Sequence, residues 1–403
     1  MITVDEALNT VLGQVEMLGV ETVSLEQAHS RILAEDVRAD MDLPPFDRSR
    51  MDGYAVRSRD VMTAPASLNL IGEIAAGAKF YGKLNPGEAV KIFTGAPIPE
   101  GADAVQKVEV THSDGHTVEI SEPVRPGQFI TPRASEVAAG ETVARLGREI
   151  GPAVMAVLAS FGYAEVKVGR RPRVAVISTG SELVKVSTRP SGAQIRNSNS
   201  YTIASYAARA GAIVDLLGTV EDTPEATLNA LVDAAEGRDM VITSGGVSMG
   251  DYDLVKGALA EMGAEVYFDK VIIRPGKPTV FARRDQTFFF GLPGNPVSTS
   301  VTFNVFARPA IRKMQGDRKP LLPTIRAALA QPLKDASSRR SYLPARLTIE
   351  NGRALAEPLK WGGSSDFVAF MQSDALIIVR EESHDLAEGE LVEVVLLNAI
   401  AEG

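Results

Sequence analysis

The chain is organised around the stretch Met240-Val-Ile-Thr-Ser-Gly-Gly-Val-Ser-Met-Gly-Asp-Tyr-Asp253. It begins as a short apolar strand, breaks at two glycines and leads into residues 254–262, whose apolar spacing predicts a helix. Glycines let a ligand approach the backbone, and the first amides of a helix are unpaired, so this order favours a bound phosphate or other oxyanion. Asp251 and Asp253 would repel an anion unless a cation such as Mg²⁺ lay between them. The stretch indicates a phosphate and metal site, or else only a tight connection with solvated aspartates.

The residues around this stretch alternate between apolar strands and helices. Strands are expected at 174–177 and 214–218, which predicts a doubly wound parallel sheet with helices on both faces. Ligands of such sheets bind beyond the carboxyl ends of the strands. Glu182 and Asp222 each follow one of these strands, as Asp251 and Asp253 follow the next, so we expect the four carboxylates on one rim. Asp222 before Thr223-Pro224 could also be a simple helix cap.

Further candidate ligand contacts lie on both sides of the acidic rim. The Pro-Gly pairs in residues 273–278 and 291–298 are turn signals, and an Asn-Pro pair suits the start of a helix whose first amides, at Val297 and Ser298, are free. Three basic side chains nearby, those of Lys270, Arg274 and Lys277, suit an anionic substrate, although surface lysines are often only solvated. The candidate substrate-binding residues are Ser244, Gly245, Gly246, Ser248, Lys270, Arg274, Lys277, Pro293, Gly294, Asn295 and Pro296.

The remaining sequence predicts three further domains. A capping box, Thr3-Val-Asp-Glu6, opens an amphipathic helix, and a second helix is expected near residues 26–34. Short β-prone runs separated by Gly and Pro fill residues 68–130, and β patterning returns after residue 320. We expect an α/β multidomain protein with an N-terminal helical or mixed domain (1–47 plus 137–170), an inserted β domain (48–136), the central α/β domain (171–318) and a C-terminal β-barrel-like domain (319–403).

Composition excludes several classes of function. The 403 residues are 45% hydrophobic and carry a formal net charge of −9, which gives no general attraction for nucleic acid or an anionic membrane surface. The chain has no cysteine, and therefore no disulfide, thiolate metal site or cysteine nucleophile. It has no signal-peptide pattern and no apolar run near the roughly twenty residues that span a bilayer. We expect a cytoplasmic protein with neither nucleic-acid nor membrane partners.

Six motifs, in order along essentially the whole chain, resemble the bacterial MoeA family, the molybdopterin molybdenumtransferases, which are related to the E domain of gephyrin. They are Met51-Asp-Gly-Tyr-Ala-Val56, Phe93-Thr-Gly-Ala-Pro-Ile-Pro-Glu-Gly101, Ser178-Thr-Gly-Ser-Glu182, Ser244-Gly-Gly-Val-Ser-Met-Gly-Asp-Tyr-Asp253, Arg274-Pro-Gly-Lys-Pro278 and Gly291-Leu-Pro-Gly-Asn-Pro296. No single motif is specific, but the six together are.

The resemblance implies the fold, the reaction and the site. It implies an elongated homodimer of four-domain subunits whose α/β domain binds molybdopterin. The reaction would insert molybdate at the dithiolene of adenylylated molybdopterin and release AMP with the help of Mg²⁺. Transient contacts are expected with the molybdopterin adenylyltransferase and with molybdoenzyme maturation factors. Matched positions imply functional roles for Asp52, Glu182, Asp222, Asp253, Pro293 and Pro296, with Glu182, Asp222 and Asp253 as metal ligands.

Two positions depart from the family pattern. Glu136 stands where relatives usually have aspartate, which keeps the charge but moves it by one methylene, and Arg274 stands where lysine is frequent. Asp52 lies in the N-terminal half, far along the chain from Glu182, so in a twofold dimer we expect Asp52 to complete the site of the other subunit. From composition alone, its proline-stiffened loop could be only a domain crossing.

The sequence leaves two rival functions open. The α/β domain alone would look similar in a molybdopterin adenylyltransferase, but the additional β domains and Asp52 argue against that enzyme. The gephyrin relationship suggests a scaffold with a degenerate site, but a scaffold would have no reason to keep Glu182, Asp222 and Asp253.

Overall fold

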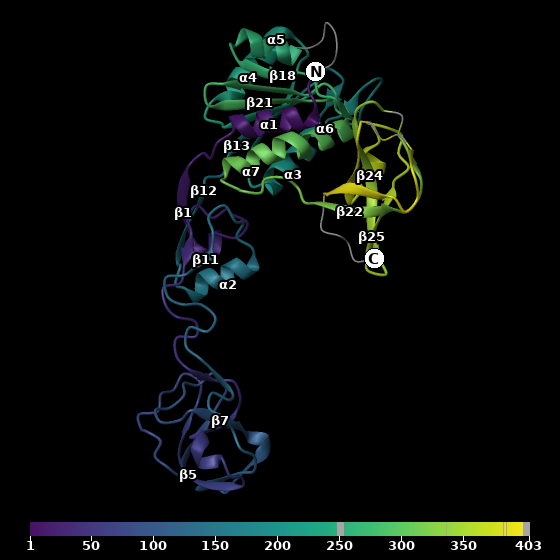
Figure 1. Ribbon diagram of the computed structural model, residues 1–403. Coiled ribbons are helices and arrows are strands. Elements are labelled where there is room, and N and C mark those ends of the chain that lie inside the picture. Colours follow the sequence, from purple (N-terminus) through teal and green to yellow (C-terminus); the bar gives the residue numbers. More distant parts are fainter. Residues whose placement is uncertain (248–253, 336, 382, 384, 398–403) are drawn as a thin grey trace. The chain divides into compact units, whose positions relative to one another are not determined.

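The computed structural model describes residues 1–247, 254–335, 337–381, 383 and 385–397. Two compact units make up the chain: a larger one of residues 1–34, 147–151 and 165–403, and a smaller one of residues 35–146 and 152–164. Figure 1 shows both units. In the described part, no helix is long and apolar enough to cross a membrane.

A six-stranded mixed sheet is the centre of the larger unit. Its order is β16 (Ile213–Val220), β13 (Arg173–Thr179), β17 (Met240–Ser244), β21 (Thr287–Leu292), β20 (Val280–Arg284) and β18 (Glu265–Phe268). The first four strands are parallel to one another. At the edge, β20 pairs antiparallel with β21, and β18 pairs antiparallel with β20. The predicted doubly wound parallel sheet is therefore confirmed, with an antiparallel extension at one edge.

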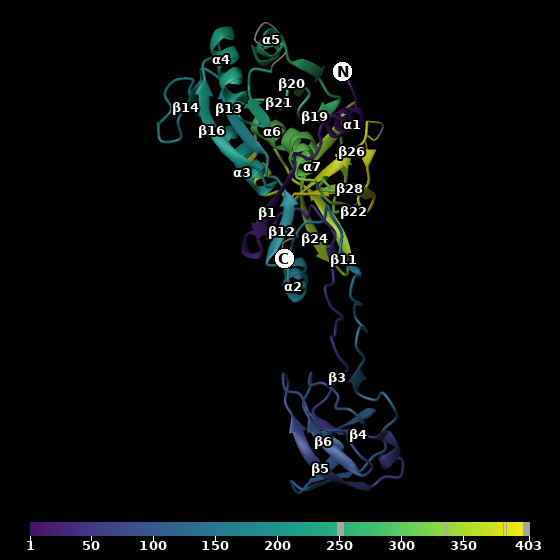
Figure 2. The same cartoon turned by 90° about the vertical axis from the view of Figure 1, so that its left-hand side faces the viewer.

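Helices cover both faces of this sheet because alternate residues of a strand point to opposite sides. On β13, Val174 and Val176 join one core cluster while Ala175 and Ile177 join the other. Figures 1 and 2 show α1 (Val4–Gln14), α3 (Asn199–Arg209) and α7 (Arg308–Met314) on one face, and α4 (Pro224–Ala235) and α5 (Leu254–Glu261) on the other. The remaining elements of this domain are α6 (Pro296–Thr302), the π-helical turn η4 (Phe303–Ala307), and the short pair β14 (Leu183–Val184) and β15 (Ile195–Arg196).

The N-terminal helix forms as the capping box predicts. The Thr3 side chain accepts from the Glu6 backbone, and the Glu6 side chain accepts from the Thr3 backbone. The buried residues Val4, Ala7 and Val11 pack into the cluster that holds α7 and η4. Helix α1 is therefore part of the α/β core.

The prediction of a helix near residues 26–34 is wrong. Only the 3-10 turn η1 (Leu25–Gln27) forms there. It follows β1 (Val20–Ser24), which pairs with β12 (Glu165–Gly169). Ser30 has a positive φ of 61°, and the following amides of Leu33 and Ala34 donate to distant carbonyl groups. The apolar residues that suggested a helix are buried by this long-range main-chain pairing instead.

A closed five-stranded barrel forms the C-terminal domain. The strands β24 (Arg340–Glu350), β25 (Arg353–Pro358), β22 (Thr324–Leu329), β28 (Leu391–Leu396) and β26 (Ala375–Val379) pair in this order, and β26 returns to β24. The barrel-like prediction is confirmed. One further strand, β19 (Ile273–Arg274), comes from the α/β domain and pairs with β24. The short pair β23 (Leu333–Lys334) and β27 (Asp385–Leu386) and the helix α8 (Phe367–Phe370) complete the domain.

The smaller unit is built around a second six-stranded sheet. Its order is β7 (Ala104–Lys107), β4 (Gly53–Val56), β6 (Glu88–Ile92), β5 (Ala66–Ile74), β9 (Thr117–Ile120) and β8 (Thr111–Ser113). Two short pairs accompany it: β3 (Arg48–Ser49) with β10 (Ile130–Thr131), and β2 (Val37–Arg38) with β11 (Thr142–Ala144). The helix α2 (Pro152–Ser160) and the 3-10 turns η2 (Ser58–Val61) and η3 (Val108–Val110) are the remaining elements.

Candidate functional site

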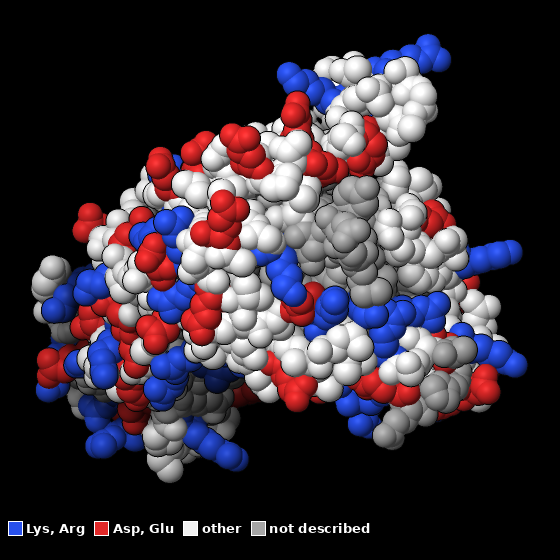
Figure 3. Space-filling view, turned by 90° about the horizontal axis from the view of Figure 1, so that it is seen from above, with Lys and Arg blue, Asp and Glu red and all other residues white. Residues whose placement is uncertain are grey.

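A cavity of about 1300 Å³ opens at the carboxyl ends of the parallel strands. It lies within the larger unit, and residues of both the α/β domain and the C-terminal barrel line it. Acidic and basic side chains lie beside one another over much of the face seen in Figure 3. The predicted residues that line the cavity are Glu182, Asp222, Ser244, Gly245, Gly246, Arg274, Lys277, Pro293, Gly294, Asn295 and Pro296. The structure therefore brings together most of the candidate residues of the α/β domain.

The remaining predicted residues are not among the described residues that line the cavity. Ser248 and Asp253, like Asp251, lie outside the described residues. Lys270 belongs to the described chain but does not line the cavity, and its backbone carbonyl accepts a hydrogen bond from Ile2. Asp52 and Glu136 belong to the smaller unit and are described below.

The acidic side of the cavity is formed by two exposed carboxylates that follow neighbouring strands. Glu182 comes after β13 and Asp222 after β16, and the backbone N–H of Ser181 donates to Asp222 Oδ2 at 3.3 Å. The alternative role of Asp222 as a helix cap is excluded, because Thr223 is the N-cap of α4 and its side chain accepts from the Ala226 backbone. The Asp222 carboxylate is thus left for the cavity.

These two carboxylates fit a magnesium ion that is shared with a substrate. Among the described residues, no three Asp, Glu, His or Cys side chains lie close enough to form a complete metal site. Mg²⁺ rarely needs one, because it keeps several waters and is held by one or two carboxylates together with substrate phosphates. Glu182 and Asp222 line the same cavity, so the donor set present fits this mode of binding.

The glycine turn after β17 is required by packing as well as by backbone conformation. Gly245 and Gly246 have positive φ values of 90° and 67°. A Cβ on Gly245 would lie 2.5 Å from the Thr179 carbonyl oxygen, and one on Gly246 would lie 2.8 Å from Thr179 Oγ1. The glycines therefore let the ends of β13 and β17 approach each other at the floor of the cavity.

Asn199, which the sequence reasoning missed, joins two parts of the floor. Its Nδ2 donates to Ser244 Oγ and to the Gly294 carbonyl oxygen, both at 2.7 Å. Its Oδ1 is buried and has no hydrogen-bond partner in the described structure. The sequence feature that could have pointed to Asn199 is its position at the start of α3, the helix that follows β13 and the short pair β14 and β15.

The turn before α6 connects the α/β domain to the barrel. Asn295 and Pro296 occupy the N-cap and first helical positions, as predicted, but the Asn295 side chain makes no cap hydrogen bond. Its Nδ2 instead donates to Ser364 Oγ at 2.9 Å. The Val297 amide, expected to be free for phosphate, donates to the Ser364 carbonyl oxygen at 3.0 Å, so that expectation is wrong. The sequence pattern could not show that the barrel supplies this acceptor.

The basic side of the cavity combines predicted and unpredicted residues. Arg274 and Lys277 come from the loop between β18 and β20, and Arg274 forms an ion pair with the buried Asp335. Arg339, which the sequence reasoning missed, also lines the cavity, and its Nη1 donates to the Ile273 carbonyl oxygen at 3.2 Å. It lies just before β24 in the C-terminal domain, far along the chain from the predicted motifs.

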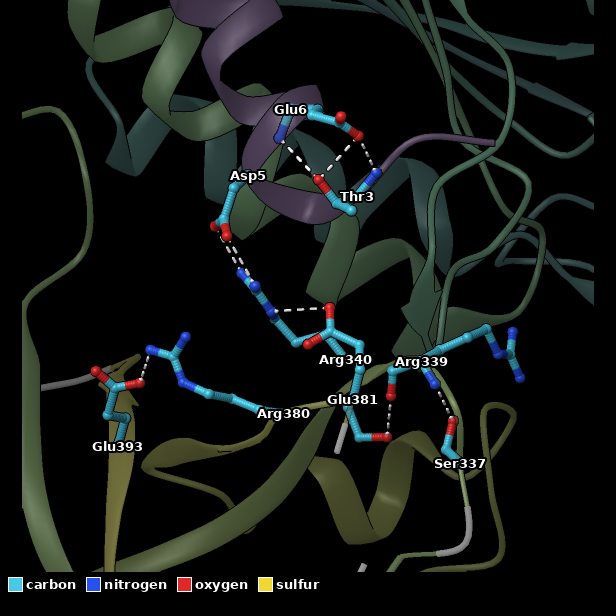
Figure 4. A network of polar contacts seen from close by, with 10 residues as sticks. Thr3, Asp5, Glu6, Ser337, Arg339, Arg340, Arg380, Glu381 and Glu393 are labelled. Atoms are coloured by element: carbon cyan, nitrogen blue, oxygen red, sulfur yellow. Dashed lines mark hydrogen bonds and ion pairs between the residues drawn. The ribbon is translucent and has the colours of Figure 1, made fainter. Parts of the chain in front are cut away.

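Neighbouring Arg340 has a different role from Arg339. Figure 4 shows the two guanidinium groups pointing in different directions, Arg340 toward Asp5 and Glu381 and Arg339 away from them. The Arg340 nitrogens bind both Asp5 oxygens, at 2.6 and 2.8 Å, and this ion pair lowers the pKa of Asp5. Arg340 thus ties α1 to the barrel, whereas Arg339 is left for the cavity.

In the smaller unit, Asp52 and Glu136 each have a defined partner. One oxygen of Asp52 accepts from both the backbone N–H and the hydroxyl of Thr94, and these hydrogen bonds lower the pKa of the exposed carboxyl group. Glu136 forms an ion pair with Arg48 at 2.8 Å, with both side chains substantially exposed. Thr94 lies within one of the six motifs, but the sequence did not show that it binds Asp52.

Comparisons with known proteins agree with this architecture. Family models for the MoeA N-terminal region (domains I and II), the "Probable molybdopterin binding domain" and the MoeA C-terminal region (domain IV) match residues 2–162, 175–313 and 326–397. Proteins named molybdopterin molybdenumtransferase match at 35% identity in Staphylococcus aureus (99% of this chain, 96% of the relative) and at 37% in Haemophilus influenzae (98% of each).

Solved structures show the same similarity over the whole chain. A molybdopterin biosynthesis MoeA protein from Pyrococcus horikoshii is 30% identical and superimposes with a TM-score of 0.85, covering 98% of this chain and 100% of that one. A second structure of a MoeA protein from this organism is 32% identical with a TM-score of 0.82, over 99% and 100% of the two chains. By its three matched regions and its full-length relatives, this chain belongs to the MoeA family.

Proposed function

We propose that this chain is a molybdopterin molybdenumtransferase that inserts molybdate into adenylylated molybdopterin and releases AMP. The observation that carries the proposal is one large cavity whose lining includes both carboxylates and cations. A ligand with a pterin, a phosphoanhydride and a nucleoside is long and anionic, and it needs both volume and separate groups for metal and phosphate. The names of the full-length relatives agree with this reaction.

The residues of the cavity divide into three roles. Glu182 and Asp222 would hold Mg²⁺, which, when bound, supplies charge neutralisation at the phosphoanhydride. Arg274, Lys277 and Arg339 offer cationic hydrogen-bond donors to phosphate or molybdate oxygens. Asn199 and the glycine turn shape the floor against which the ligand lies.

In this reaction water attacks the phosphoanhydride and AMP leaves with its phosphate. The two dithiolene sulfurs lose their protons and replace two oxygen ligands of molybdate, which take up protons and leave as water. These residues bind and orient the anionic groups during that exchange. No covalent protein nucleophile is needed.

The two rival functions receive less support. A molybdopterin adenylyltransferase would need only the α/β domain, whereas here Arg339 and Ser364 of the barrel line the cavity as well. A scaffold would not need Asp222, whose carboxylate is released from helix capping by Thr223. The cavity as a whole therefore favours an enzyme that acts on the adenylylated pterin.

The proposal is tested by measuring AMP release. The protein is incubated with adenylylated molybdopterin, with molybdate and Mg²⁺ each present or omitted, and AMP is quantified by chromatography. We expect release that requires Mg²⁺ and is stimulated by molybdate. A parallel incubation with molybdopterin and ATP tests the rival: formation of adenylylated pterin there, without molybdate-stimulated AMP release, would identify an adenylyltransferase.

We further propose a cytoplasmic homodimer in which Asp52 of one subunit completes the acidic site of the other. Support comes from the separation of Asp52 and Glu182 into different compact units and from the twofold symmetry usual for homodimers. Transient contacts with the adenylyltransferase that supplies the substrate and with molybdoenzyme maturation factors would follow from the reaction.

Subunit mixing tests the shared site. Inactive Asp52→Asn and Glu182→Gln proteins are unfolded and refolded together, and about half of the dimers should be mixed. In each mixed dimer one site carries both lesions and the other neither, so about a quarter of wild-type activity should return. Activity no higher than that of the separate variants, with mixed dimers confirmed by two affinity tags, would exclude the shared site.

A further inference from the structure

One cation of the cavity is held by a carboxylate that lies outside the cavity lining. Arg274 Nη1 binds Asp335 Oδ1, and the two side chains differ sharply in exposure, 42% for Arg274 and 2% for Asp335. Among the described residues, the other guanidinium nitrogens of Arg274 have no protein partner, although a guanidinium group carries five N–H donors. One edge of Arg274 is therefore anchored in the protein, and the rest is available to a ligand in the cavity.

The C-terminal domain contacts Arg274 through one of its strands and also supplies Asp335. Arg274 lies on β19, which pairs with β24 so that Arg274 is opposite Ser341. Asp335 directly follows β23 and lies shortly before β24, and its Oδ1 also accepts from the Ser337 backbone N–H at 3.2 Å. The anchor is therefore part of the C-terminal domain, while the anchored residue belongs to a loop of the α/β domain.

The other basic side chains of the cavity are held differently. Arg339 donates to the Ile273 carbonyl oxygen, and Arg196 donates to the Thr188 carbonyl oxygen. Arg274 is the cavity-lining arginine or lysine, among the described residues, for which the structure records a carboxylate partner. Removing one member of a buried charge pair is costly because the other member is left unpaired.

We propose that Asp335 is a positioning residue for anion binding, which orients Arg274 so that its free N–H groups face the phosphate or molybdate oxygens of the substrate. The inference rests on the proposed function, since it assumes that the cavity binds these anions. Its consequence is that the barrel, and not the α/β domain alone, determines where this cation lies. Asp335 acts through Arg274 and does not touch the substrate itself.

The test is a double-mutant cycle on anion binding. Dissociation constants for AMP and for molybdate, each alone, are measured by calorimetry for the wild type, Asp335→Asn, Arg274→Ala and the double variant. Asparagine keeps the shape of aspartate and removes its charge, and Asp335→Ala provides a second truncation. Glu393→Gln is the matched control because it removes the partner of Arg380, an ion pair of the same barrel that involves no cavity-lining residue.

We expect Asp335→Asn to weaken binding of at least one probe about fivefold or more, since a charged anchor is lost. In the Arg274→Ala background the same substitution should change nothing further, because contacting residues that act as a unit are not additive. In turnover assays KM should rise while kcat is retained. Glu393→Gln should bind both probes as the wild type does.

Three results would overturn the proposal, and they differ from one another. An equal loss in both backgrounds would mean that Asp335 supports the fold and not Arg274. Unchanged binding in Asp335→Asn, with weakened binding in Arg274→Ala, would mean that Arg274 needs no anchor. If the wild type bound neither probe, or if Arg274→Ala bound both as tightly as the wild type, the cavity would not bind anions as proposed. That result would be a failure of the proposed function.

Discussion

Thr94 donates both its backbone N–H and its hydroxyl group to the same oxygen of Asp52, each at 2.7 Å. Both hydrogen bonds favour the ionised carboxylate, and they lower the pKa of Asp52 below its ordinary value. The loop that carries Asp52 therefore holds a carboxylate that stays charged at neutral and mildly acidic pH.

Removal of the Thr94 hydroxyl should raise the pKa of Asp52 toward its ordinary value. In Thr94→Val the backbone hydrogen bond remains and the hydroxyl bond is lost, so the acid limb of the activity profile should move to higher pH if ionised Asp52 is required. Thr94→Ser, which keeps the hydroxyl, is the control. An acid limb at the same pH in both variants, with the Asp52 pKa followed by carboxyl NMR, would show that ionisation of Asp52 is not used.

Neutralisation of the acidic rim should abolish turnover more than it affects binding. Asp222→Asn is expected to lose at least about tenfold in kcat while still binding adenylylated molybdopterin, because this carboxylate would hold a metal ion and not the pterin. EDTA added to the wild type should have the same effect. Glu225→Gln is the matched control, because Glu225 lies in the first turn of α4, just after Asp222, but does not line the cavity. Near wild-type turnover in Asp222→Asn would make the rim structural.

The departure at Glu136 can be tested by charge and by length. Glu136→Gln should reduce turnover by more than about tenfold if the carboxylate acts in the site, whereas Glu136→Asp, the residue usual in relatives, should be mild. Stability should change little in either variant, since the ion pair with Arg48 is exposed. Glutamine and aspartate variants with the same activity would show that the charge at this position has no role.

Two glycines with similar backbone conformations separate conformational strain from packing. Gly246 and Gly237 have φ values of 67° and 64°, so alanine at either position should cost about 1 kcal/mol or more for the left-handed backbone. At Gly246 the added Cβ would also lie 2.9 Å from Val255 Cγ2 and closer still to Thr179 Oγ1, whereas at Gly237 it meets nothing within 4 Å. Thermal unfolding should therefore show a larger loss for Gly246→Ala, together with weaker ligand binding. Equal losses would mean that the floor of the cavity tolerates a side chain.

The sequence predicted the parts of the site that depend on local pattern. Strand followed by glycine turn and helix placed Gly245 and Gly246 correctly, and the carboxyl-end rule placed Glu182 and Asp222 in the same cavity. What it missed depends on contacts between distant segments. Arg339 and Ser364 reach the cavity only because the barrel packs beside it, and the segment near residue 30 is not helical because its main-chain partners lie more than a hundred residues later.

Lys270 shows the limit of reasoning from proximity in sequence. It lies close to Arg274 and Lys277 along the chain, but it does not line the cavity that they line. Its segment is bound to the N-terminus, where Ile2 and Val271 form a bridge. No local pattern shows which of three neighbouring cations will turn toward a ligand, since this depends on the backbone partner of each one.

The most direct test of the account is the stoichiometry of metal insertion. Wild-type protein and Glu182→Gln are incubated with adenylylated molybdopterin, molybdate and Mg²⁺, and the pterin-bound molybdenum and the released AMP are measured in the same samples. We expect equal amounts of the two products in the wild type and neither above background in the variant. AMP released without pterin-bound molybdenum, or molybdenum inserted equally well by Glu182→Gln, would contradict it.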